Sequence, residues 1–220
     1  MRQESETFCA GYSLAEVMVV VVIMAVVGAL AVPAMGQWLS NQRLQDSARS
    51  LESAFEFARG EAIRTGNIHL VLFDQDPDGN DLVDGNGDTV PILVLNDGRP
   101  GAVDQNCDVD GGEPTRAFGL DEDVTFGVSE AAAKAPTDSG GGSMSSGSTF
   151  RDAGNNAATW VMFRPEGTPL AFSSDCSTGA IGSAAGGAYL TNGARDVAIV
   201  VTPLGASRLH SFSAARGWSD

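Results

Sequence analysis

The chain has 220 residues, 43% of them hydrophobic, and a formal net charge of −15, which suits one globular domain with an apolar segment attached. Between Asp74 and Glu130 there are fifteen acidic residues and only two basic ones, Arg99 and Arg116. Such an acidic balance repels phosphate backbones, so general nucleic-acid binding is disfavoured and solubility or cation affinity is favoured.

The first predicted element is a long apolar helix that begins beside a single carboxylate. The 22 residues from Leu14 to Met35 carry no charge except that of Glu16. At about 1.5 Å per residue they reach roughly 33 Å, enough to cross a bilayer core. A signal peptide is shorter and is cut after its apolar stretch, whereas the candidate cleavage point here, between Gly11 and Tyr12, precedes it. A charge in such a segment is costly and is retained where it has a partner, so Glu16 is the leading candidate for a functional residue.

This arrangement resembles the type IV pilin and type II secretion pseudopilin superfamily. The resemblance implies that residues 1–11 are a leader, which a prepilin peptidase removes by cutting after Gly11, and that Tyr12 becomes the N-methylated N-terminus. It also implies that Glu16, then the fifth residue, neutralises the terminal amine of a neighbouring subunit during assembly. Pro33 lies where these helices usually bend. The implied location is the inner membrane, with a single pass and a periplasmic C-terminal domain, followed by a pilus or pseudopilus.

The helix is predicted to continue beyond Pro33 to about Thr65. Its second half has one apolar stripe with steps of four and three residues, which is the pattern of a helix that lays one face on a core. Gly66 is a suitable helix cap. The stripe consists of Leu44, Ala48, Leu51, Phe55, Ala58 and Ala62.

Residues 67–220 are predicted to form a β-rich domain. Residues 139–148 contain only Gly and Ser apart from Met144 and are predicted to be a flexible loop. Short apolar runs separated by turn residues favour two packed antiparallel sheets. The predicted strands are 68–73, 90–95, 124–128, 159–163, 170–172, 188–190, 197–201 and 207–212.

The predicted fold class is therefore α+β and pilin-like: a long N-terminal membrane-spanning helix packed on a C-terminal domain of two antiparallel β-sheets. The predicted segments are a leader (1–11), a transmembrane and assembly helix (12–35), an amphipathic continuation of the helix (36–66) and the β-rich domain (67–220).

Several segments make the resemblance more specific. Residues 163–167, 187–193 and 197–208 are similar to the closing strands of the GspH/FimT group of minor pseudopilins and pilins, and 41–44 and 59–63 are similar to that group's helix. The resemblance implies a protein that assembles with other pilins through its helix into a pilus-like fibre. Type II protein secretion and type IV pilus biogenesis both stay open as its setting.

The acidic segment after residue 73 is a candidate calcium loop. Asp74, Asp76, Asp78 and Asn80 offer oxygen ligands at alternate positions, which suits Ca²⁺. The twelfth position, counted from Asp74, is occupied by glycine where an EF-hand has glutamate. A polar β-hairpin turn is the alternative, because Asp, Asn and Gly dominate such turns. Calcium is the one cofactor that the sequence suggests.

Three cysteines are present, of which Cys9 belongs to the leader. Cys107 and Cys176 remain in the mature chain, and an oxidising compartment favours a disulfide between them. Two unlinked thiols in separate loops are the alternative.

No arrangement of residues predicts catalysis. His69 and His210 both lie in predicted strands, and no phosphate loop, metallohydrolase helix or nucleophile elbow is found, so the chain is predicted not to be an enzyme. Some members of the resembled group take up DNA through basic residues near the closing hairpin, where this chain has Arg195, Arg208 and Arg216. The mature charge of −14 disfavours that role. The alternative function is a membrane-tethered or pilus-tip module that binds DNA or calcium.

Overall fold

The computed structural model describes residues 12–98, 107 and 113–219, and the side chains of 30–34 are not among those described. By its internal contacts the chain divides into two units, Met1–Leu39 and Ser40–Asp220. The helix α1 (Leu14–Thr65) runs from the first unit into the second. The predicted segments 12–35 and 36–66 therefore belong to one helix.

The predicted membrane-spanning character of this helix is wrong. No helix in the described part of the chain is long and apolar enough to cross a membrane. From residue 40 onwards the helix is polar or amphipathic. Pro33, where a bend is predicted, is one of the residues whose side chains are not described.

The second unit contains two antiparallel sheets, as predicted, and each sheet has five strands. The first has the order β3-β2-β1-β5-β6 and the second the order β10-β9-β8-β7-β4. The strands are β1 (His69–Phe73), β2 (Ile92–Asn96), β3 (Thr115–Phe118), β4 (Thr125–Phe126), β5 (Trp160–Phe163), β6 (Pro169–Leu170), β7 (Gly186–Thr191), β8 (Asp196–Val201), β9 (Ser207–Ser213) and β10 (Gly217–Ser219).

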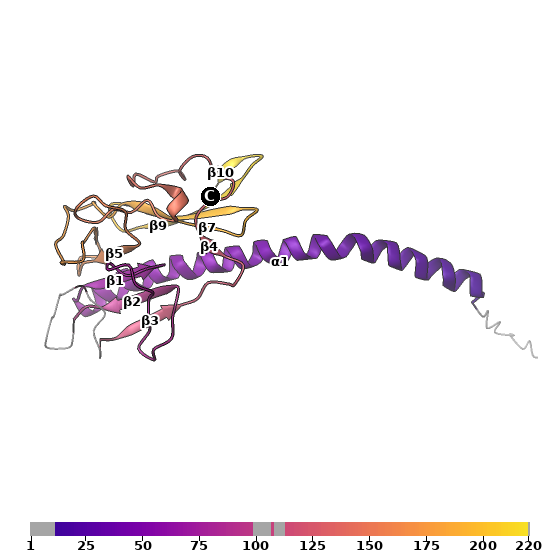
Figure 1. Ribbon diagram of the computed structural model, residues 1–220, viewed down its shortest axis with the longest axis horizontal. Coiled ribbons are helices and arrows are strands. Elements are labelled where there is room, and N and C mark those ends of the chain that lie inside the picture. Colours follow the sequence, from indigo (N-terminus) through magenta and orange to yellow (C-terminus); the bar gives the residue numbers. More distant parts are fainter. Residues whose placement is uncertain (1–11, 99–106, 108–112, 220) are drawn as a thin grey trace, which may run out of the picture. The chain divides into compact units, whose positions relative to one another are not determined.

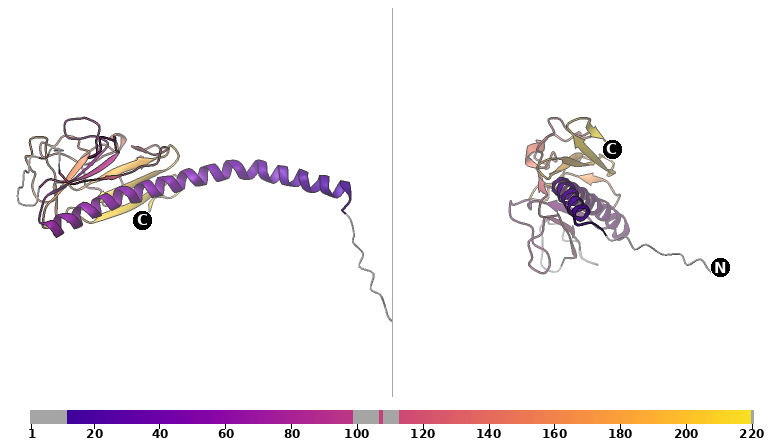
Figure 2. Two further views of the ribbon diagram at one scale, coloured as in Figure 1. Left: turned by 90° about the horizontal axis from the view of Figure 1, so that it is seen from below. Right: turned by 90° about the vertical axis from the view of Figure 1, so that its right-hand side faces the viewer.

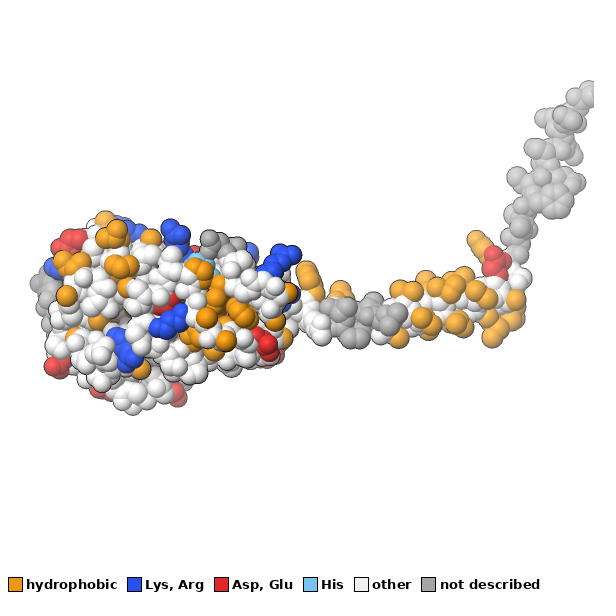
Figure 3. Space-filling view, turned by 90° about the horizontal axis from the view of Figure 1, so that it is seen from above, with side chains coloured by type: hydrophobic (Ala, Val, Ile, Leu, Met, Phe, Trp, Pro, Cys, Tyr) orange, Lys and Arg blue, Asp and Glu red, His pale blue; other side chains and the backbone are white. Residues whose placement is uncertain are grey.

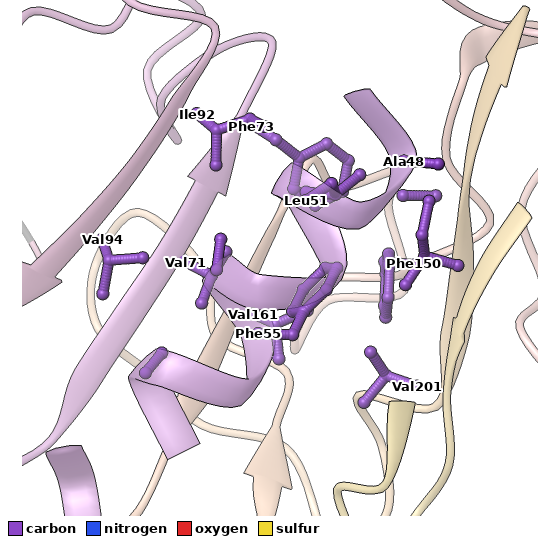
Figure 4. Close-up of a cluster of buried hydrophobic side chains, with 14 of the residues drawn as sticks. Ala48, Leu51, Phe55, Val71, Phe73, Ile92, Val94, Phe150, Val161 and Val201 are labelled. Atoms are coloured by element: carbon purple, nitrogen blue, oxygen red, sulfur yellow. The ribbon is translucent and has the colours of Figure 1, made fainter. Parts of the chain in front are cut away.

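The part of α1 that belongs to the second unit lies between the two sheets (Figures 1 and 2). The predicted stripe from Leu44 to Ala62 is fully buried, and its members join inward-facing residues of both sheets in one cluster. Phe55 contacts Phe73 of β1 and Phe150, with ring centroids 6.1 Å and 6.0 Å apart (Figure 4). The helix ends as expected, because Gly66 has a φ of 73° and donates its N–H to the carbonyl of Ala62.

Both sheets are also covered on the face that points away from the helix. In β1, Val71 and Phe73 face the helix, whereas Leu70 and Leu72 belong to a second cluster with Leu82 of the acidic segment. Strand side chains alternate between the two faces, so this double coverage explains why these strands are apolar throughout rather than alternating. A third cluster covers the outer face of the other sheet with Ala135, Tyr189, Ala198 and Val200, and with the partly buried Val128, Met144 and Trp218.

The loop 139–148 packs closely on its neighbours. It contains a short 3₁₀ helix, η1 (Met144–Ser146). A Cβ on Gly140 would approach the carbonyl oxygen of Thr149 to 2.4 Å, and one on Gly142 would approach the Cα of Thr149 to 2.6 Å. Close backbone approach is therefore a physical reason for glycine at these two positions.

Candidate processing and assembly site

The N-terminal end of α1 is organised by a serine cap. The Oγ of Ser13 accepts the backbone N–H of Glu16 at 3.3 Å, and the Ser13 carbonyl accepts the N–H groups of Glu16 and Val17 at 3.1 and 3.2 Å. Serine is among the best N-cap residues because its hydroxyl satisfies a backbone donor that the helix leaves without a partner. Tyr12 is 83% exposed, and Gly11, the other half of the predicted cleavage site, lies outside the described residues.

Glu16 lies in the first turn of the helix, where a carboxylate interacts favourably with the positive end of the helix dipole. Ser13 and Glu16 also have the spacing of a capping box, in which serine caps the helix and an acid follows three residues later. This signal is readable from the sequence alone. A local stabilising role is thus available to Glu16 besides the predicted pairing with a neighbouring subunit.

The first part of α1 presents apolar side chains to its surroundings. Val20 is 48% exposed and Met24 69%, and hydrophobic side chains cover the described part of the helix in Figure 3. Large apolar surfaces of this kind mark sites of protein or membrane contact. The exposed residues are Leu14, Val17, Met18, Val19, Val20, Val21, Val22, Ile23, Met24, Val26, Val27, Met35, Trp38 and Leu39.

The acidic segment forms two successive turns held by their own carboxylates. Asp76 Oδ1 accepts the backbone N–H groups of Asp78 and Asn80 at 2.9 and 2.8 Å, and Asp76 Oδ2 accepts the Asn80 side-chain amide at 3.1 Å. Asp84 Oδ1 likewise accepts the backbone N–H groups of Asn86 and Asp88, and Asp84 Oδ2 accepts the side-chain amide of Asn86. These hydrogen bonds lower the pKa of Asp84. Short Asp-Asn-Gly segments of this kind stabilise turns, which is the physical basis of the hairpin alternative.

The predicted calcium ligands are not gathered into a group of carboxylates. Asp74 has a φ of 68°, and its pKa is raised by burial and by the nearby Asp81. Within the described ranges, one group of three or more His, Cys, Asp or Glu residues has its ligand atoms within 4.8 Å of one another, and it consists of Asp97, Cys107 and Cys176. Calcium binding by Asp74, Asp76, Asp78 and Asn80 stays a prediction.

A disulfide joins Cys107 and Cys176, the alternative that the sequence analysis favoured, with the two Cα atoms 5.3 Å apart. Cys107 is 1% exposed and Cys176 is partly buried, and both have positive φ angles. The bridge belongs to the outer cluster of the first sheet, which also contains Leu95 and Phe172.

The remaining predicted residues are dispersed over the second unit. His69 is buried in β1, where desolvation lowers the pKa of its ring, and His210 is buried in β9. Arg195, Arg208 and Arg216 are exposed. The prediction that the chain is not an enzyme and the prediction that it does not bind DNA both stay predictions.

One buried carboxylate of structural importance was missed. Asp196, the first residue of β8, accepts the backbone N–H groups of Ser129, Glu130 and Ala131 at 2.6–2.8 Å. Burial raises the pKa of this carboxyl, but the hydrogen bonds outweigh burial and leave the pKa below its ordinary value. No local sequence signal marks this residue, because its partners are about 65 residues away in the chain.

The sequence matches no family model, and no curated protein or solved structure is significantly similar to it. The resemblance to pilins therefore rests on the residues described above.

Proposed function

We propose that this chain is a minor pilin or pseudopilin, which assembles with other pilins through the first part of α1 into a pilus-like fibre. The observation that carries the proposal is the exposed apolar surface of 14–29, on which Glu16 is the one charged residue. Apolar side chains gain free energy when they leave water, and helices of neighbouring subunits are surfaces of matching chemistry.

Glu16 supplies the specificity of this assembly. Apolar helices can slide along one another at little cost, whereas a carboxylate among apolar side chains gains most from an opposite charge that is equally removed from water. The amine of an N-terminal Tyr12 on a neighbouring subunit is such a charge. Pairing it with Glu16 fixes the axial position of one helix relative to the next.

The genes beside the one for this chain distinguish the two settings of the fibre, type II secretion and type IV pilus biogenesis. Neighbouring genes for a secretion ATPase, an outer-membrane secretin and general-secretion pseudopilins support a type II secretion pseudopilus. Neighbouring genes for pilus retraction and twitching support a type IV pilus.

Processing is the first test. The full chain is produced in cells with and without a prepilin peptidase, and its N-terminus is determined by mass spectrometry. We expect cleavage after Gly11 and methylation of Tyr12 only in the presence of the peptidase, and no cleavage of a Gly11→Val variant. An unchanged N-terminus in both strains would contradict the proposal.

The role of Glu16 is the second test, and it must separate assembly from helix capping. Glu16→Ala and Ser13→Ala both weaken the first turn of the helix, but only Glu16→Ala removes the charge that pairs. We expect Glu16→Ala to be processed but largely absent from fibres, and Ser13→Ala to enter them. Equal incorporation of both variants would show that the carboxylate does not set the register.

A further inference from the structure

The surroundings of the disulfide contain a buried carboxylate. Asp97 follows β2 directly and is completely buried, and its backbone N–H is bonded to the carbonyl of Ile68 at 3.1 Å. The Oδ2 atom of Asp97 accepts the backbone N–H of Cys107 at 3.3 Å. A carboxylate oxygen of Asp97 and the sulfurs of Cys107 and Cys176 all lie within 4.8 Å of one another.

These three side chains are the ligand types of a zinc site once the sulfurs are no longer bonded to each other. Thiolates select soft or borderline cations such as Zn²⁺, and a carboxylate is a common additional ligand. In a tetrahedral site with Zn–S distances of about 2.3 Å, the two sulfurs stand roughly 3.7 Å apart. The Cα atoms of the two cysteines are 5.3 Å apart, so side-chain rotation can open the sulfurs to that separation without moving the backbone far.

We propose that the disulfide masks a redox-gated binding site for a thiophilic divalent cation, with Cys107, Cys176 and Asp97 as its ligands. A dithiol reductant cleaves the S–S bond, supplies two electrons and two protons, and is itself oxidised to a disulfide. The two thiols then bind Zn²⁺ as thiolates and release two protons, while the Asp97 carboxylate takes the third position and water the fourth.

Charge compensation favours this arrangement. Two thiolates and a carboxylate at these distances, in surroundings where Asp97 and Cys107 are buried, repel one another strongly. A divalent cation between them removes most of that repulsion. In the oxidised protein the sulfurs carry no charge, so the cation is neither needed nor bound.

This site differs in chemistry from the acidic turns of residues 74–88. Those turns offer only oxygen atoms, which suit Ca²⁺, and their affinity does not depend on the redox state. The proposed site requires sulfur and exists only after reduction. It is independent of fibre assembly, so either proposal can fail without the other.

The test uses the full chain, reduced with excess dithiothreitol and freed of the reductant under anaerobic conditions. Co²⁺ is then added as a spectroscopic probe, and Zn²⁺ is used to displace it. We expect one Co²⁺ per chain, with thiolate-to-cobalt charge-transfer and tetrahedral d–d bands, and displacement of Co²⁺ by Zn²⁺. The oxidised chain is expected to show none of these bands.

Variants assign the ligands. Cys107→Ser and Cys176→Ser should each abolish the tetrahedral spectrum, and Asp97→Asn should keep the charge-transfer band but weaken binding by about tenfold or more. Asp84→Asn in the acidic segment is the matched control and should bind as the wild type does. Circular dichroism establishes that each variant is folded, and Zn²⁺ should slow alkylation of both thiols in the reduced wild type. Absence of the bands and of thiol protection in the reduced wild type, or unchanged affinity in folded Asp97→Asn, would overturn the proposal.

Discussion

Helix α1 carries two apolar segments with opposite surroundings. Between Leu44 and Ala62 the apolar side chains follow a single stripe and are covered by two sheets of the same chain, whereas between Leu14 and Val27 they occur all around the helix and are exposed. The first pattern is satisfied within one molecule, whereas the second leaves its apolar side chains exposed. Within this one helix, the period of the apolar pattern, rather than its hydrophobicity, separates the segment that its own chain covers from the segment that it leaves exposed.

Replacing one residue in each segment tests this comparison most directly. Phe55→Ala removes a side chain that is 1% exposed and contacts two other phenylalanines, so we expect the free energy of unfolding to fall by about 3–5 kcal/mol. Val20→Ala removes part of a side chain that is 48% exposed, and should leave that free energy within about 0.5 kcal/mol of the wild type. Urea denaturation followed by tryptophan fluorescence measures both. A comparable loss in Val20→Ala would mean that the first segment is covered within the monomer.

The covered part of the fold was largely predictable because its signals are periodic. The stripe from Leu44 to Ala62 follows the helical period, and runs such as 197–201 have the composition of buried strands. The edge strand β3 was missed because Thr115 to Phe118 is short and has an exposed arginine at its centre. Strand β10 was missed for a similar reason, since it has three residues and begins with glycine.

The exposed segment was predicted to span a membrane from its length, its lack of charge beyond Glu16 and its resemblance to pilins, and this prediction is wrong because no helix in the described part of the chain is long and apolar enough to cross one. Contacts between distant residues escaped prediction for a different reason. Asp97 beside the disulfide and Asp196 beneath residues 129–131 are ordinary acids in the sequence, and only the paired strands bring them to their partners. The Ser13–Glu16 cap, by contrast, follows from spacing alone and could have been predicted.

The disulfide offers a second test of the comparison. It cross-links two parts of the second unit and does not involve the first segment of the helix. The bridge closes a loop with a sequence separation of 69, and its loss lets the unfolded chain gain entropy. We expect the double variant Cys107→Ser and Cys176→Ser to lose about 2–4 kcal/mol of unfolding free energy. Adding a reductant should lower the stability of the wild type towards that of the variant. A variant as stable as the oxidised wild type would show that the unfolded chain is not constrained by the bridge.

Asp196 tests how much a buried polar group contributes to stability. The second unit contains such groups, whereas the described side chains of the first helical segment include none. Asp196→Asn places an amide donor where the carboxylate now accepts three backbone N–H groups, so we expect a loss of about 1–3 kcal/mol at pH 7. The folded pKa of Asp196 lies below its ordinary value, so its contribution is complete above about pH 4 and is lost as the pH falls through the folded value. The difference between variant and wild type should therefore shrink at pH 3. A difference that is the same at both pH values would assign the effect to packing instead of charge.

The smallest effect is expected at the exposed end of the helix. Ser13→Ala removes the hydroxyl that accepts the Glu16 N–H, and the loss of such a cap costs about 1 kcal/mol of local helix stability. Because residue 13 lies in the first unit and the cooperative core in the second, global unfolding should not change. Hydrogen exchange should instead be faster at the amides of the first turn, from Leu14 to Val17, and unchanged in β1 and β8. Faster exchange in those strands would mean that the two parts of α1 unfold as one unit, and the contrast between them would then describe exposure but not stability.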